Sequence, residues 1–329
     1  MKKILILFIC CLFGVACTTL EDSLRQAVEQ NDEIAVNNVL NRGINPNFNS
    51  SDNTPLLILA AAQGNESIVK SLIKAGADIN ATDKNNWTAL MTAVKERNTE
   101  IVQILVNAGA DVNKKGDTLN KSPYTRCVGF YCHNSYSSSH GITPLMIACQ
   151  REQVDIVRIL LKAGASVNVR GERGDTALIE ATRRGNVEIV EMLIDAGADI
   201  NLRNDERDSA LSIADRKKYI NTEKAILSSG ATLPDGSTSL MIASINGYID
   251  VAKKIIARGV DVNVQDKNDK QTALMLASLH DHPEIVELLL SVGANVHMKD
   301  KNGNTALGFA RRFNNKKIIN MLKAAGARY

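Results

Sequence analysis

The sequence predicts an all-α fold in which short helix-turn-helix repeats are stacked as a solenoid. Three observations lead to this fold class. A pattern of about 33 residues recurs along the chain, and periods of 20 to 50 residues are typical of stacked repeats. Each copy contains two apolar segments of helical length, and the second ends at a glycine. Only 4% of the 329 residues are aromatic, as expected for a thin core of Ala, Leu, Ile and Val.

In every repeat except the first, the first helix is predicted to begin at Thr-Pro-Leu, Thr-Ala-Leu or a close variant. Thr and Ser are favoured helix N-caps because their side-chain oxygen accepts a hydrogen bond from the first turn. Pro55 and Pro144 follow two of these Thr residues, and proline suits the first helical position. We count about nine repeats, which start near Asp22, Thr54, Thr88, Thr143, Thr176, Ser209, Thr238, Thr272 and Thr305.

The second helix of each repeat carries an apolar stripe and ends at Ala-Gly-Ala or a variant. Residues 68–80 (IVKSLIKAGADIN) and 189–201 (IVEMLIDAGADIN) are clear examples. The stripe recurs at helical spacing, and glycine supplies a left-handed C-cap at low cost. The glycines expected in this role are Gly76, Gly109, Gly164, Gly197, Gly230, Gly259, Gly293 and Gly326.

Together the two motifs resemble the ankyrin repeat, and the resemblance covers nearly everything after residue 21. It implies an ankyrin-repeat solenoid whose repeats are joined by β-hairpin-like loops. It also implies that the loop tips and the first helices form a protein-binding face. A set of recurring asparagines fits the hydrogen bonding of the repeat itself: Asn80, Asn113, Asn168, Asn201 and Asn263.

Residues 1–16 are typical of a secretory signal peptide. Lys2 and Lys3 precede an apolar run from Ile4 to Phe13, and small residues follow. A basic start, an apolar stretch and a small-residue cleavage site define such signals. The run is shorter than the ~20 residues that a membrane-spanning helix needs. We therefore predict an exported protein.

Cys17 lies where a bacterial lipoprotein signal carries its lipid. Val15 and Ala16 fit that pattern, whereas Gly14 stands where Leu is usual. The resemblance implies a lipidated Cys17, a short linker over residues 17–21 and the repeat array over residues 22–329. It places the protein on a membrane of a bacterial cell envelope, on the periplasmic or surface side. Simple cleavage after Ala16, which would give a secreted, unanchored binder or effector, is the alternative.

An insertion at about residues 114–142 lengthens one repeat. The interval from Thr88 to Thr143 is 55 residues, which is 22 more than one period. Long loops with aromatic side chains are favoured recognition sites, although a tolerated surface loop would cost little. The insertion contains four of the 13 aromatic residues and one arginine, which we predict to contact a protein partner: Tyr124, Arg126, Phe130, Tyr131 and Tyr136.

The cysteines of the insertion favour a disulfide over a metal site. Cys127 and Cys132 are close in sequence in a chain with an export signal, and an oxidising compartment favours their pairing. His133 and His140 leave a zinc site open, but the spacing matches no strong zinc pattern. Cys149 lies in an Ala-rich first helix and is expected to be buried.

Two other departures from the repeat are candidate contact surfaces. Trp87 is the single Trp of the chain and lies in a loop position that usually faces outward in ankyrin repeats. It is a candidate partner-binding anchor, with burial against the neighbouring repeat as the alternative. The interval from Ser209 to Thr238 is only 29 residues, so the loop at residues 230–237 is expected to be truncated. That shortening either marks a contact surface or reflects sequence drift.

Composition and motifs argue against nucleic-acid binding and catalysis. The formal charge of +3 is too small for a binder that neutralises many phosphates. The chain contains no His-Glu-x-x-His, Gly-x-Ser-x-Gly or phosphate-loop motif. His282 and the loop tip Asp300–Asn304 are expected to be structural. We predict a non-enzymatic protein-interaction scaffold without metal, cofactor or small-molecule substrate. An enzyme or ligand-binding protein that uses the insertion is a third possibility.

Overall fold

The computed structural model describes residues 19–117, 126–128, 131–133, 141–229 and 237–328. For residues 126–128 and 131–133 it describes the backbone alone. The described residues form eighteen α-helices, α2 to α19, which follow one another in pairs. The chain divides into two compact parts, Met1–Ala177 and Leu178–Tyr329. Each part is a stack of helix pairs, which is the predicted all-α repeat solenoid.

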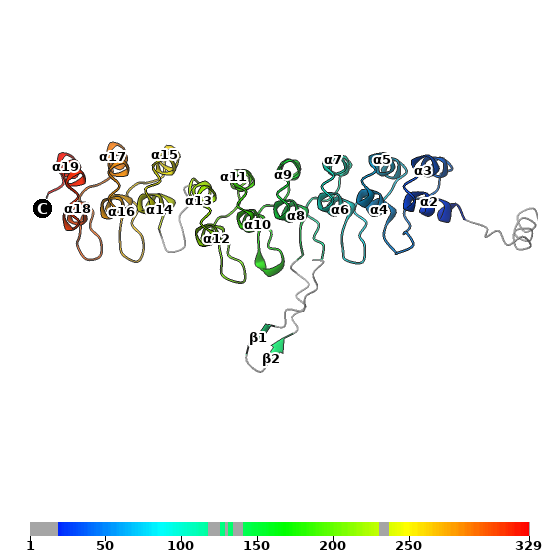
Figure 1. Ribbon diagram of the computed structural model, residues 1–329, viewed down its shortest axis with the longest axis horizontal. Helices are drawn as coiled ribbons and strands as arrows, with labels where there is room; N and C mark the ends of the chain where they lie inside the picture. The colour runs from blue at the N-terminus through cyan, green and yellow to red at the C-terminus, as the bar shows by residue number, and fades with distance from the viewer. Residues whose placement is uncertain (1–18, 118–125, 129–130, 134–140, 230–236, 329) are drawn as a thin grey trace, which may run out of the picture. The chain divides into compact units, whose positions relative to one another are not determined.

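The first part contains four complete helix pairs (Figure 1). Each helix packs against its partner in the pair, and helices at the same position in successive pairs also pack together. This regular stacking buries one continuous core. The pairs are α2 (Leu20–Glu29) with α3 (Glu33–Leu40), α4 (Leu56–Gln63) with α5 (Glu66–Lys74), α6 (Ala89–Lys95) with α7 (Thr99–Asn107), and α8 (Pro144–Gln150) with α9 (Val154–Lys162).

The second part continues the same plan, with one irregular position. Helix α13 packs against α14 as well as against α12 and α15, whereas the pairs from α14 onward repeat the regular stacking. The pairs are α10 (Ala177–Arg184) with α11 (Val187–Asp195), α12 (Ala210–Lys217) with α13 (Ile220–Leu227), α14 (Ser239–Asn246) with α15 (Ile249–Ala257), α16 (Ala273–Leu279) with α17 (Pro283–Ser291), and α18 (Ala306–Arg312) with α19 (Lys316–Ala324).

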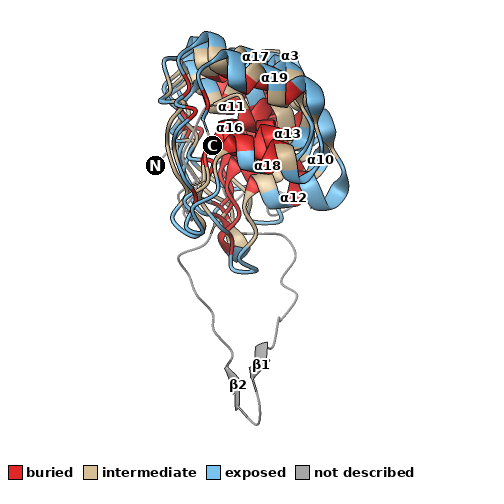
Figure 2. Ribbon diagram, turned by 90° about the vertical axis from the view of Figure 1, so that its left-hand side faces the viewer, coloured by how far each residue is buried: buried red, intermediate tan, exposed pale blue. Residues whose placement is uncertain are grey.

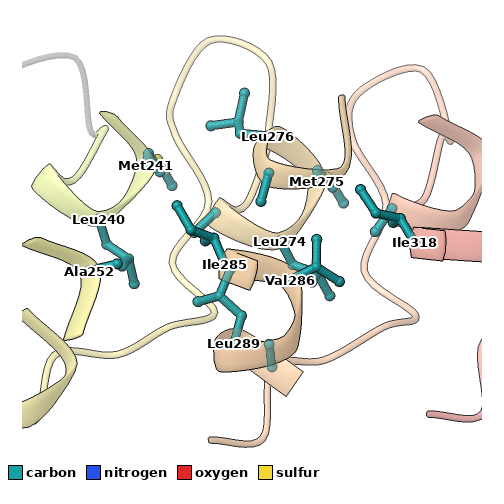
Figure 3. Packing of buried hydrophobic residues seen from close by; sticks show 14 of the residues in the cluster. Leu240, Met241, Ala252, Leu274, Met275, Leu276, Ile285, Val286, Leu289 and Ile318 are labelled. Carbon is teal, nitrogen blue, oxygen red and sulfur yellow. The ribbon is translucent and has the colours of Figure 1, made fainter. Parts of the chain in front are cut away.

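Aliphatic residues make up most of the buried core. Figure 2 marks the buried residues in red along the helices. Within the second part, Leu274 of α16 meets Ile285 and Leu289 of α17, and all three side chains are almost completely buried (Figure 3). The largest fully buried side chains of the described residues are Leu, Ile and Met, among them Leu24, Ile68 and Met91. The low aromatic content therefore has the cause expected from the sequence.

The predicted hydroxyl N-caps are confirmed at six helices. In each case the side-chain oxygen of the cap accepts a hydrogen bond from the backbone N–H three residues later, which fixes the helix start. The caps are Thr88, Thr143, Ser209, Thr238, Thr272 and Thr305. Helix α2 begins at Leu20 and is capped by Thr19, so the first helix starts two residues before the expected Asp22.

One predicted helix start is wrong. Pro55 is not the first residue of α4 but occupies the N-cap position, with ψ of 135° and no side-chain cap hydrogen bond. Pro55 forms an isolated antiparallel bridge with Asn49, which holds it in an extended conformation and delays the helix by one residue. Pro144 does take the first helical position, as expected.

The glycines after the second helices have the predicted left-handed conformation wherever they are described. Gly76, for example, has φ of +92°, a conformation that residues with a Cβ rarely adopt. Gly109, Gly164, Gly197, Gly259, Gly293 and Gly326 share it. Gly230 lies outside the described residues.

Candidate interaction surface

The loops that join one helix pair to the next are called fingers below, and polar side chains fix the turn in described fingers. In the finger before α6, Asp83 Oδ1 accepts hydrogen bonds from the backbone N–H of Asn85 and of Trp87, both at 2.8 Å. Asp300 does the same before α18, where it accepts from Asn302 N at 2.9 Å and Asn304 N at 2.7 Å. These contacts fix the turn, so the loop tip predicted at Asp300–Asn304 is confirmed.

A row of asparagines ties successive fingers to one another. Asn80 Oδ1 accepts a hydrogen bond from Asp111 N at 2.8 Å, and Asn263 Oδ1 accepts from Asn295 N at 2.8 Å. The row continues across the insertion, because Asn113 Oδ1 accepts from Ser166 N at 2.7 Å. The hydrogen-bonding role predicted for Asn80, Asn113 and Asn263 is confirmed. The insertion therefore leaves the joining of its flanking repeats intact.

A second set of contacts crosses from one pair to the next at the turn between the two helices. Asn98 Nδ2 donates to the carbonyl of Ala61 at 3.2 Å, and Gln153 Nε2 donates to the carbonyl of Val94 at 2.8 Å. His282 makes the equivalent contact in the second part, with 2.9 Å between its Nε2 and the carbonyl oxygen of Ile245. His282 is thus structural, as expected.

The two ends of the insertion are paired where it leaves the array, at Gly116 and Ile142, and this pairing is called the base of the insertion. Gly116 and Ile142 form an antiparallel bridge in which Gly116 N donates to Ile142 O at 3.0 Å and Ile142 N donates to Gly116 O at 2.8 Å. The two ends of the insertion are therefore side by side. A Cβ at Gly141 would lie 2.7 Å from the carbonyl oxygen of Gly116, so this close approach requires glycine.

Trp87 packs under this base. Its side chain is only 7% exposed, and its indole Nε1 donates a hydrogen bond to the carbonyl oxygen of Asp117 at 2.6 Å. The backbone N–H of Asp117 donates to the carbonyl oxygen of Asn85 at 2.8 Å. The expected outward orientation of Trp87 is wrong, and the alternative of burial against the neighbouring repeat is confirmed. The indole reaches the next finger because Gly116 has no side chain in its path.

Within the insertion the structure describes two short strands. β1 (Arg126–Val128) pairs with β2 (Tyr131–His133) in antiparallel register, with Arg126 opposite His133, Cys127 opposite Cys132 and Val128 opposite Tyr131. Two predicted partner-binding residues therefore lie on strands. The other three, Tyr124, Phe130 and Tyr136, lie outside the described residues. Cys149, in α8, is completely buried as predicted.

The short repeat of the second part has its own polar contacts. Asp208 accepts two hydrogen bonds from the guanidinium of Arg216, at 2.9 and 2.6 Å. These hydrogen bonds lower the pKa of Asp208 below its ordinary value. The truncated loop expected at residues 230–237 lies outside the described residues except for Ser237.

A buried carboxyl group lies where α13 packs against α14. Glu223 is 8% exposed and accepts a hydrogen bond from Asn246 Nδ2 at 3.2 Å. Burial raises the pKa of Glu223, and the charge of Asp215 adds to this. Next to it, Lys224 lies over the ring of Tyr248 at 4.8 Å and pairs with Asp250 at 3.4 Å. Sequence reasoning missed this junction because these residues come from four different helices.

A model of ankyrin repeats in three copies matches the chain over residues 24–116, 124–204 and 240–329. These ranges cover well over half of the 329 residues. The chain belongs to the ankyrin repeat family. No curated protein matches it in sequence.

The ankyrin matches break at the two places where the repeat is irregular. Residues 117–123 begin the insertion, and residues 205–239 contain α12, α13 and the short loop after them. The short repeat therefore lies outside the family pattern, whereas the insertion falls within the second match from residue 124 onward. The rest of the chain has the ordinary ankyrin plan of protein-interaction scaffolds.

The described part of the ankyrin array holds no group of three or more His, Cys, Asp or Glu side chains placed to bind a metal ion. None of its helices is long and apolar enough to cross a membrane. What it offers is a row of fixed fingers, and one of these carries an insertion with a closed base.

Proposed function

We propose that this ankyrin protein is a lipid-anchored scaffold of a bacterial envelope that holds a protein partner through the insertion between α7 and α8. The observation that carries the proposal is the base of that insertion. Gly116 and Ile142 close it, and Trp87 holds it from the preceding finger. A tolerated surface loop needs no such support, whereas a recognition element gains affinity when its ends are fixed in advance.

The insertion carries side chains suited to a protein contact. Arg126 and Tyr131 lie on β1 and β2, and the sequence adds Tyr124, Phe130 and Tyr136. Tyr, Phe and Arg are enriched at the centres of protein interfaces because they bury large surfaces and still offer polar groups. This composition favours a folded protein over a small molecule as the partner.

The register of β1 and β2 supports a disulfide between Cys127 and Cys132, which are direct cross-strand partners. Opposed residues of an antiparallel pair have Cα atoms about 4.5–5.5 Å apart. A disulfide needs about 4.4–6.8 Å between Cα atoms. In the proposed reaction both thiols are oxidised by an external disulfide, which is reduced to two thiols as the new S–S bond forms.

The proposed anchor lies close to the array. Cys17 precedes the start of α2 at Leu20 by three residues, which an extended chain spans in about 10 Å. A lipid on Cys17 would hold α2 and α3 near the membrane surface and would raise the local concentration of partners bound to that membrane. Cys17 and the signal segment lie outside the described residues.

Deletion of residues 118–139 tests the insertion. We expect the deletion protein to fold, because the base residues and the contact between Asn113 and Ser166 remain, and to lose its partner in crosslinking from envelope extracts. Replacement of residues 118–139 by Gly and Ser at equal length is the matched control and should lose the partner as well. Undiminished capture by either protein would exclude the insertion as the main contact.

Replacement of Cys17 by Ser tests the anchor. We expect the variant to leave the membrane fraction and to lack the lipid mass on its N-terminal peptide. Unchanged membrane association and processing would contradict lipidation. A wild-type protein found in the medium, without lipid, would instead support the secreted binder.

A further inference from the structure

The last described helix pair, α18 with α19, is strongly cationic. Residues 301–329 contain seven basic residues and no acidic residue: Lys301, Arg311, Arg312, Lys316, Lys317, Lys323 and Arg328. The chain as a whole has 39 basic and 36 acidic residues. This pair therefore carries more positive charge than the entire protein, and the remainder is net acidic.

Two of these cations serve the stacking within the array. Lys317 pairs with Glu284 of α17 at 3.2 Å, and Lys301 pairs with Asp269 in the preceding finger. Others are exposed. Lys316 and Lys323 lie seven residues apart on α19, which places them on one side of the helix. Arg312 and Arg328 are exposed as well.

This cationic surface includes exposed apolar area. Phe313, at the end of α18, is 53% exposed. Among the described helices, α18 packs against α16 and α19, and α19 packs against α17 and α18. Within the described chain, the side of the pair that faces away from α16 and α17 is not packed against another helix.

The first described pair, α2 with α3, has the opposite charge. Residues 19–47 contain two basic residues, Arg25 and Arg42, and five acidic residues, Glu21, Asp22, Glu29, Asp32 and Glu33. Two of these carboxylates contact the next repeat, since Glu29 accepts a hydrogen bond from Ser51 N at 2.7 Å and Glu33 accepts one from Ser67 of α5. This pair also exposes apolar side chains, with Leu20 at 42% and Ile34 at 75%. It packs against α4 and α5 on one side. Among the described helices, the other side is not packed against a partner.

Opposite signs on these two pairs favour contact between copies of the chain. Surfaces of equal sign would repel one another and keep copies apart. Both free sides also have the shape that ankyrin pairs use against their neighbours, because each pair in a stack contacts its neighbours through the same two sides. Charge and shape therefore both favour a second copy of the chain as the molecule that binds each surface.

We propose that the cationic α18/α19 pair of one molecule docks against the acidic α2/α3 pair of a second copy. The contact is heterologous, since different surfaces meet, and such contacts generate open chains unless the rotation closes a ring. The exposed Phe313 and Ile34 supply apolar area to the contact. If the scaffold is membrane-bound as proposed above, an open chain of copies would place several partner-binding insertions on one assembly.

Sedimentation of the full chain in dilute non-ionic detergent tests this proposal, since detergent shields the apolar N-terminal segment. We expect the average mass to rise with protein concentration at low salt and to fall as salt is added. Lys316→Glu with Lys323→Glu should weaken association by about tenfold or more, since like charges would then meet. Lys253→Glu with Lys254→Glu, two exposed lysines of α15, is the matched control and should associate as the wild type does.

A mixing experiment separates this contact from any other. Glu33 accepts a hydrogen bond from Ser67 of α5 and so faces the neighbouring pair, and it is therefore left unchanged. Glu21→Lys reverses an exposed charge on the acidic pair and should also weaken association. Mixed with the Lys316→Glu, Lys323→Glu protein, it should form dimers that do not grow, because one intact surface remains on each molecule. A wild type that stays monomeric at low salt, or variants that associate normally, would overturn the proposal. Binding of monomers to anionic phosphatidylglycerol vesicles through Lys316 and Lys323 would assign the surface to a membrane and overturn it too.

Discussion

The indole Nε1 of Trp87 donates a hydrogen bond to the carbonyl oxygen of Asp117, 2.6 Å away. This bond joins the finger before α6 to the next finger along the array, at the point where the insertion begins. The single Trp of the chain is therefore a positioning residue, because it holds the base from which the insertion extends. In the proposed function, the insertion meets its partner from this supported base.

Trp87→Phe should lower the free energy of unfolding by about 1–3 kcal/mol, since it removes the N–H donor and leaves a gap beside a buried ring. It should also speed proteolysis within residues 118–140, because the base of the insertion loses its hydrogen bond. Urea denaturation followed by circular dichroism measures the first effect, and limited proteolysis with mass spectrometry measures the second. Equal proteolysis of wild type and variant would show that Trp87 does not hold the insertion.

Gly116→Ala should also be destabilising, by about 1–3 kcal/mol. A Cβ at this position would lie 2.9 Å from Trp87 Cδ1 and 2.9 Å from Met91 Sδ, so the ring and the thioether would have to move. Gly308→Ala in α18 is the matched control, because the nearest heavy atom there is 3.8 Å away. Alanine is the better helix former, so this control should gain about 0.5–1 kcal/mol. A loss of stability in both variants would point to a cause other than crowding at Trp87.

The sequence left open whether Trp87 is exposed or buried, and the reason is physical. Its contacts, Gly116 and Asp117, come from the next repeat, and the indole reaches them because position 116 lacks a side chain. The position of Trp87 in a loop that usually faces outward does not indicate that its indole contacts the next repeat. The pairing of Asn49 with Pro55, which shifts the start of α4, is hidden in the same way.

Features that depend on neighbours in sequence were predicted well. Thr88 and Thr143 cap their helices because the acceptor and the donor lie three residues apart. Gly76 ends α5 because the left-handed conformation is a local requirement. The buried Glu223 was missed, since Asn246 and Tyr248 reach it only after α13 has packed against α14.

Asn113→Ala should cost about 0.5–1.5 kcal/mol, the usual net value of an intramolecular hydrogen bond. Its side chain accepts from Ser166 N at 2.7 Å and donates to Gly164 O at 3.3 Å, across the whole insertion. Asn80→Ala is the comparison, since Asn80 makes the same contact to Asp111 between adjacent repeats without an insertion. We expect similar costs by urea denaturation. A loss for Asn80→Ala alone would mean that the insertion interrupts the row of asparagines in solution.

Glu223→Gln should stabilise the protein at neutral pH. Burial raises the pKa of Glu223 above its ordinary value of 4.5, so the folded state holds the proton more tightly than the unfolded state does. Its ionisation above that pH therefore favours unfolding. Glutamine keeps the acceptor for Asn246 and carries no charge. The gain over wild type should be present at pH 7 and disappear as the pH falls below 4.5, where the wild-type carboxyl is also neutral.

Asp208→Asn should have the opposite sign and is the control for that experiment. The hydrogen bonds from Arg216 lower the pKa of Asp208 below 3.8, so its stabilisation is present above that pH and is lost as the pH falls through the lowered pKa. The Asn variant should therefore be less stable than wild type at pH 7, and the difference should shrink in acid. Urea midpoints by circular dichroism from about pH 3 to pH 7 give both curves.

A loss of stability at pH 7 in Glu223→Gln would mean that the Glu223 charge is compensated at the junction of α13 and α14. The neighbouring cation able to do so is Lys218, whose charge acts on Glu223 in the lowering direction.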